Sequence, residues 1–149
     1  MATWAQFTAA APDIAALGLK LLHKYQIAYL ATVRKDGAPR VHPVSPFIID
    51  GRLFVATKPS SPKAYDQLRD GRYVLHALPG ENDDEFLIRG RSIAVTDAVT
   101  RALIMAQGPH FVHADDYFFE YDISSAATTF WENVGKPGTC PIRRHWREG

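Results

Sequence analysis

The sequence predicts a mainly β domain in which six or seven antiparallel strands close into a small barrel, with a few helices beside it. Short runs rich in β-branched and aromatic side chains recur along the chain, as is typical of strands. Short turns join most of these runs, which favours antiparallel pairing. A closed barrel removes the exposed edges that such strands would otherwise present. The 149 residues fit one domain, covering 1–149.

The net charge and the cysteine content limit the partners and the cellular compartment to be expected. The net charge of +1 gives no electrostatic reason to expect a nucleic acid or an anionic membrane as partner. The only cysteine, Cys140, excludes an internal disulfide and is consistent with a reducing compartment. We find no signal-peptide pattern at the N-terminus and no apolar run long enough to span a bilayer. The expected location is therefore the cytoplasm.

Residues 1–25 are expected to form a helical segment. Thr3 and Gln6 have the spacing of a capping box, which predicts a first short helix. Pro12 is well suited to open a second helix. Apolar residues then recur at helical spacing and give this second helix one apolar face: Ile14, Leu17, Leu21, Leu22 and Tyr25. We expect that face to cover part of the sheet.

The second predicted strand, Arg40–Ile49, contains Pro43 and Pro46. Proline cannot donate a ladder hydrogen bond, so this part of the strand should lie at an edge, a bulge or a gap. Asp50–Gly51 then predicts a tight hairpin turn. The other predicted strands are 27–34, 52–57, 72–78, 85–95 and 116–123, and 126–133 is either a seventh strand or a turn around Trp131. Gly90 predicts a bulge or bend, and helices are expected over 61–69 and from a Thr96 cap through Met105, with Val99 and Leu103 facing inward.

The loop between strand 52–57 and helix 61–69 is the strongest candidate for a binding site. Hydroxyl and ammonium groups gather here, at Thr57, Lys58, Ser60, Ser61 and Lys63, and Arg40 precedes them on a neighbouring strand. Ser61 is a good N-cap and Pro62 a good first helical residue. Unpaired N–H groups at a helix start attract anions, so the loop predicts a phosphate cradle. The alternative is an ordinary helix start that binds water.

From residue 27 to 95, the order of strands and the segment Thr57–Lys63 (TKPSSPK) resemble the FMN-binding split-barrel family around pyridoxamine 5′-phosphate oxidase, a Greek-key type of barrel. The resemblance implies a homodimer with FMN at the subunit interface. It implies that Arg40, Ser61, Pro62 and Lys63 hold the FMN phosphate. It further implies that the flavin ring is lined by Val41, His42, Pro43, Ala56 and Thr57, and by Trp131 of the second subunit.

The basic tail, 134–149, departs from the family pattern. Arg143 and His145 have the spacing of the Arg-x-His pair that grips substrate in true pyridoxamine phosphate oxidases. The segment Gly135–Gly138 places this pair farther from Trp131 than the family pattern does. Related split barrels bind FMN, the deazaflavin coenzyme or haem. The resemblance therefore implies an FMN-dependent oxidoreductase acting on a small molecule, or a flavin-, deazaflavin- or haem-binding protein with little turnover.

No side chain is assigned a catalytic role, because a bound flavin would carry the hydride chemistry itself. His42 is either a histidine of the barrel wall or an axial haem ligand. His110 and His113 lie near Asp115 and Asp116, but their spacing matches no metal signature, so we expect a solvated loop and no metal site.

Overall fold

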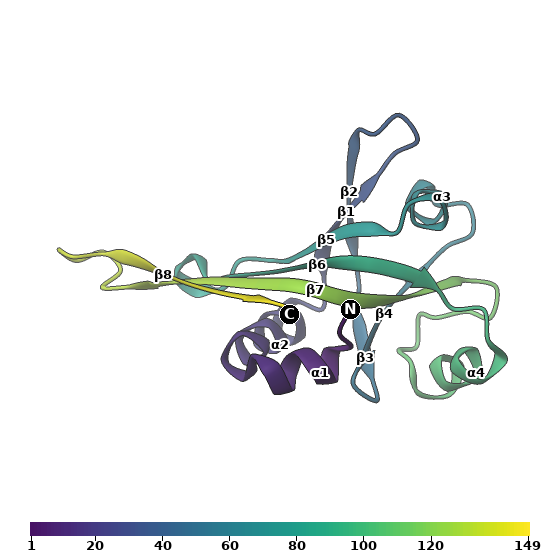
Figure 1. Cartoon of the computed structure of the whole chain (residues 1–149), viewed down its shortest axis with the longest axis horizontal. Helices are drawn as coiled ribbons and strands as arrows, with labels where there is room; N and C mark the ends of the chain where they lie inside the picture. Colours follow the sequence, from purple (N-terminus) through teal and green to yellow (C-terminus); the bar gives the residue numbers. More distant parts are fainter.

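The computed structural model describes all residues, 1–149. It contains four α-helices, one short 3-10 helix and eight strands (Figure 1). In chain order these are α1 (Trp4–Ala10), α2 (Pro12–Tyr25), β1 (Ala28–Val33), β2 (Pro39–Val44), β3 (Phe47–Ile49), β4 (Arg52–Thr57), α3 (Pro62–Arg69), β5 (Arg72–Ala77), η1 (Glu81–Asp83), β6 (Glu85–Ala94), α4 (Ala98–Gln107), β7 (Tyr117–Glu132) and β8 (Cys140–Arg147).

All strand pairs are antiparallel, in the order β2-β1-β5-β6-β7-β4-β3, and β8 pairs with β7 outside this path. The expectation of a mainly β, antiparallel fold is confirmed. Strands β2 and β3 lie at the two ends of the path, although they follow each other directly in the sequence. The hydrogen-bonded sheet is therefore open, and the chain itself links its two ends through Ser45–Pro46.

This break corrects the prediction of one strand over 40–49. Pro46 has no N–H to donate, and the chain leaves the ladder at Ser45–Pro46 before it pairs again. The expectation that the proline-bearing part lies at an edge or gap is confirmed, because β2 ends the sheet path and Pro43 pairs only with Tyr29 of β1.

The C-terminal third differs most from the sequence prediction. The two stretches expected over 116–123 and 126–133 are one continuous strand, β7, of 16 residues. The tail was not expected to be a strand, but Cys140–Arg147 pairs along β7 from Ser125 to Glu132. Together β7 and β8 form an arm that extends beyond the rest of the sheet (Figure 1).

The predicted turns and caps are largely confirmed. Thr3 and Gln6 form the capping box, Asp50 and Gly51 take positive φ in the turn between β3 and β4, and the ladder between β6 and β7 is irregular at Arg89/Gly90. A side chain at Gly90 would place its Cβ 1.8 Å from the backbone oxygen of Asp122, so only glycine fits there.

Helix α4 needs a correction. Its N-cap is Asp97, whose carboxylate accepts from the Thr100 N–H at 2.8 Å, and not Thr96. The shift by one residue turns Val99 outward, where it is 81% exposed, and buries Thr100 and Ile104 instead.

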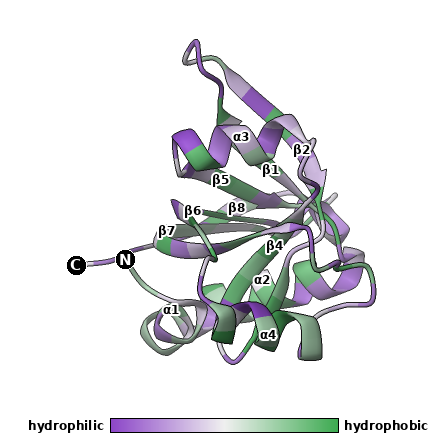
Figure 2. Cartoon of the chain, turned by 90° about the vertical axis from the view of Figure 1, so that its right-hand side faces the viewer, coloured by the Kyte–Doolittle hydropathy of each residue, from purple (hydrophilic) through white to green (hydrophobic).

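The main core joins the sheet to α1, α2 and Ala64 of α3, and Phe7, Leu21, Phe86 and Tyr121 are fully enclosed in it. A smaller cluster joins β4 and β7 to Ile104 of α4. Helix α3 lies on the other side of the sheet from α1, α2 and α4 (Figure 2). No helix is both long enough and apolar enough to cross a membrane.

Candidate functional site

The residues predicted to form a phosphate cradle, called the cradle below, lie around the start of α3. Strand β4 leads into the loop Lys58–Ser61, and α3 begins at Pro62 with Ser61 at its N-cap position. The Ser61 hydroxyl does not cap the helix; it accepts a hydrogen bond from Lys63 Nζ at 3.0 Å. Hydroxyl and ammonium therefore form one unit at the start of α3.

Lys63 is half-buried and has no carboxylate partner. Burial alone lowers the pKa of its ammonium group. A cation that has lost water without gaining a counterion is poised to bind an anion. Lys58, in the same loop, differs because its Nζ is bound to the Asp116 carboxylate at 2.9 Å.

Arg40 on β2 is held in place by Asp66 of α3, with Nε donating to Oδ2 at 2.7 Å. Asp66 is buried, with only 4% of its side chain exposed, and it also accepts from Thr32 and Arg69. The terminal nitrogens of Arg40 make no hydrogen bond within the chain. Asp66 thus fixes the guanidinium and leaves its outer N–H groups available.

His42 follows on the same face of β2. The pKa of its imidazole is lowered by burial, and then by the positive charges of Lys63 and Arg40. These three side chains therefore lie in one electrostatic environment. The neighbours Val41 and Pro43 are exposed and alternate to the opposite face of the strand, so Val41 is 60% exposed.

Ala56 and Thr57 end β4 next to the cradle. Thr57 is buried, and its hydroxyl oxygen has no hydrogen-bond partner. Such orphaned groups are rare and call for an explanation, since they cost free energy. Ala56 is partly exposed and lies on the other face, so the two side chains point in opposite directions.

The contacts that hold α3 against β7 were not predicted from the sequence. The Tyr121 hydroxyl of β7 donates to Gln67 Oε1, and Gln67 Nε2 donates to the Lys63 carbonyl at 3.1 Å. Both Tyr121 and Gln67 are buried. Asp66, the one carboxylate of α3, could have been suspected because it lies one helical turn from both Lys63 and Arg69.

Trp131, Arg143 and His145 are not brought to the cradle within one chain. They lie on the β7–β8 arm, which extends away from α3 (Figure 1). Trp131 is 37% exposed. Arg143 and His145 face a groove of about 500 Å³ that also holds Arg89 and Arg147 and contains no carboxylate.

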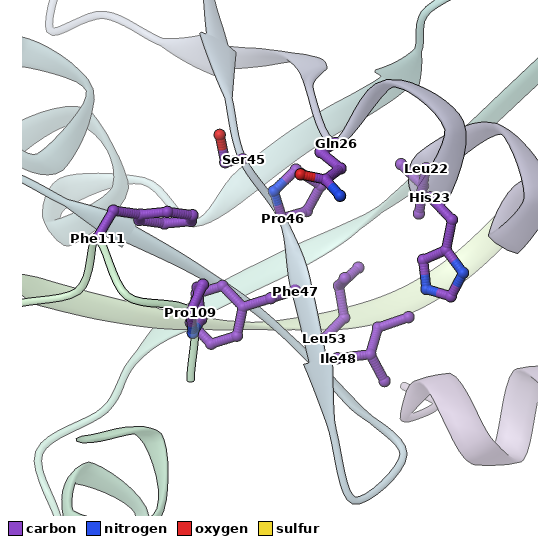
Figure 3. A pocket seen from close by; sticks show the side chains of 10 residues that line it. All are labelled: Leu22, His23, Gln26, Ser45, Pro46, Phe47, Ile48, Leu53, Pro109 and Phe111. Atoms are coloured by element: carbon purple, nitrogen blue, oxygen red, sulfur yellow. The ribbon is translucent and has the colours of Figure 1, made fainter. Parts of the chain in front are cut away.

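A separate apolar cavity of about 290 Å³ lies at the break between β2 and β3 (Figure 3). Its walls come from α2, from the β2–β3 segment and from the loop after α4, and the polar groups among them are His23, Gln26 and Ser45. Binding pockets for small molecules generally start near 300 Å³, so this cavity suits only a small group. The sequence did not predict it.

The loop that carries His110 and His113 is exposed at both histidines. Asp116 is buried and bound to Lys58 and to the His113 N–H. No three His, Cys, Asp or Glu side chains come together in a way that could hold a metal ion.

Comparison with known proteins identifies the fold of this chain but no family to which its sequence belongs. No protein-family profile matches the sequence, and no curated protein matches it. A Clostridium acetobutylicum protein related to general stress protein 26, of the pyridoxinephosphate oxidase family, is similar in structure, with a TM-score of 0.67 and 12% identity over 91% of this chain and 96% of that one.

Two further solved structures are similar. A haem-binding protein from Mycobacterium smegmatis has a TM-score of 0.61 and 14% identity over 88% of this chain and 58% of that one. HupZ from Group A Streptococcus has a TM-score of 0.63 and 13% identity over 72% of this chain and 86% of that one. The chain therefore has the split-barrel fold of pyridoxamine phosphate oxidase-like proteins.

Proposed function

We propose that the chain is a flavoprotein that binds FMN through the cradle at the start of α3 and uses it to oxidise or reduce a small molecule. The observation that carries the proposal is the Lys63 ammonium, half-buried and without a counterion, beside Ser61. A phosphate would accept from Lys63, from Ser61 and from the free nitrogens of Arg40. The unpartnered hydroxyl of Thr57 is a further donor next to this place.

A bound flavin would supply the hydride chemistry, and this chain would supply orientation and electrostatics. At neutral pH His42 is neutral, since its pKa is lowered, so it would not compete with Lys63 and Arg40 for the phosphate. The deazaflavin coenzyme also carries a phosphate and would use the same residues.

The proposed assembly is a homodimer, as the resemblance implies. One face of β1 and β2 carries exposed apolar side chains, among them Tyr29, Val41 and Pro43, and Trp131 is exposed on the arm. In a second copy, Trp131 would complete the flavin site, and Arg143 and His145 would offer positive charge to an anionic substrate.

The second candidate is a protein that holds a cofactor with little or no turnover. Two observations favour it. A solved structure with this fold is a haem-binding protein, and the lowered pKa of His42 keeps the imidazole in the neutral form that ligates iron.

The deciding experiment is a visible spectrum of the purified protein, repeated after incubation with FMN or haemin and removal of the excess. We expect a two-band flavin spectrum that stays with the protein, followed by turnover with a reductant and an acceptor. A retained Soret band that disappears in His42→Ala would support the second candidate. A protein that retains neither compound would refute both.

A further inference from the structure

A groove of about 620 Å³ continues from the cradle along the outer side of α3. Its wall includes Arg40, Pro62 and Asp66, which also belong to the cradle. Beyond them the groove runs past Arg69 to the β1–β2 turn, at Arg34 and Lys35, and Tyr65 lies on its α3 side. Nothing in the proposed FMN site accounts for this extension.

The groove is positively charged. Four cations line it, Arg34, Lys35, Arg40 and Arg69, against two carboxylates, Asp36 and Asp66, which leaves a formal charge of +2. Asp66 binds Arg40 and Arg69, at 2.7 and 3.0 Å. Arg34 and Asp36 approach only to 3.8 Å, and Lys35 has no ion pair. Half of this charge lies at the outer end, where Arg34 and Lys35 face only Asp36, and half lies at Arg40 and Arg69, which share Asp66.

Tyr65 adds an aromatic surface to this groove. It is 55% exposed on α3, between the buried residues Ala64 and Asp66. An exposed aromatic ring next to guanidinium groups is the arrangement on which a nucleobase stacks while its phosphates are bound. A phosphate alone would not need it.

We propose that this groove binds the second phosphate and the adenine of a dinucleotide flavin, so that the chain takes FAD in preference to FMN. The inference rests on the proposed flavin function and deepens it. Arg40 is shared by the two phosphates, Lys35 and Arg34 bind the second one, and Tyr65 stacks against the base.

The test compares the affinities for FMN, FAD and ADP by flavin fluorescence and calorimetry in the full-length protein. In the unaltered chain, FAD should bind at least about fivefold more tightly than FMN, since base stacking alone is worth about 1–3 kcal/mol. Tyr65→Ala and Lys35→Gln should each remove most of this advantage and leave FMN binding unchanged. Leu68→Ala, on the same helix, and Lys20→Gln, on α2, lie outside the groove and are matched controls that should change nothing.

The outcomes separate this inference from the function beneath it. Equal binding of FMN and FAD, with FMN binding that still depends on Lys63, would overturn the inference and leave the flavin function intact. If neither flavin binds, the proposed flavin function is refuted, and the affinity for ADP then tests whether the groove binds a nucleotide. ADP binding that is lost in Tyr65→Ala would support a nucleotide site, and absence of ADP binding would overturn it.

Discussion

Replacing Lys63 by Met separates a binding role of this residue from a structural one. Methionine keeps the length of the side chain and removes its charge. A charge-assisted hydrogen bond to a phosphate contributes about 1.5–3 kcal/mol, so FMN should bind roughly 10- to 150-fold more weakly. Because Lys63 remains partly exposed, the lower end of this range is expected.

The stability of the cofactor-free protein should change in the other direction. The pKa of Lys63 is lowered by burial, so at pH 7 the folded state holds this proton less tightly than the unfolded state does. The charge therefore costs stability at neutral pH, and the cost is relieved as the pH rises from the folded pKa towards the unfolded one. Cofactor-free Lys63→Met should melt at the same temperature as the parent or above it.

The assay combines FMN titration by fluorescence quenching with thermal melts of the cofactor-free protein. Lys20→Met removes an exposed lysine on α2 and serves as the control. An unchanged FMN affinity in a well-folded Lys63→Met protein would refute the phosphate site. A lower melting temperature would refute the argument that the buried ammonium lacks a counterion.

Three further predictions concern neighbouring groups. Asp66→Asn should destabilise the fold by about 3 kcal/mol in urea melts, because it leaves two guanidiniums without their buried carboxylate. Burial opposes ionisation of Asp66, but hydrogen bonds from Arg40 and Arg69 prevail and lower its pKa. The stability that Asp66 contributes should therefore be lost only as the pH falls through that lowered pKa. Thr57→Val should stabilise the cofactor-free protein by about 1 kcal/mol and weaken FMN binding, and a loss of stability would show that the hydroxyl has a partner. An NMR titration should give a His42 pKa below its usual value that rises when FMN binds, and a pKa that does not respond would place the phosphate elsewhere.

The features predicted correctly from the sequence depend mainly on neighbouring residues. The start of α3 follows from Ser61–Pro62, and the turn between β3 and β4 follows from Asp50–Gly51. Strand β8 was missed because it follows a Gly- and Pro-containing loop and is rich in Arg, with Ile142 as its only β-branched residue, and it pairs only with β7. The N-cap of α4 was misplaced by one residue because Thr96 and Asp97 are both good capping residues.

In the candidate site, the residues close together in sequence were predicted, and the contacts between distant residues were not. Arg40 and Lys63 were expected to serve one phosphate, and in the structure the charges of both act on His42. Asp66 was not expected to matter, because its role depends on Thr32 and Arg40, which lie on two other elements. Tyr121 and Gln67 were missed for the same reason, being 54 residues apart. Such contacts cannot be predicted from local spacing.

The length of β7 has a consequence for how such proteins can diverge. A single strand, with one irregularity in its pairing at Ser124, joins Tyr121, which supports α3, to Trp131 on the arm. At about 3.3 Å per residue, these ten steps separate the two residues by roughly 33 Å. Inserting two residues between them would lengthen the arm by about 7 Å and keep Trp131 on its present face, whereas inserting one would turn it to the opposite face. Lineages that alter the reach of this arm should therefore do so in even-numbered steps.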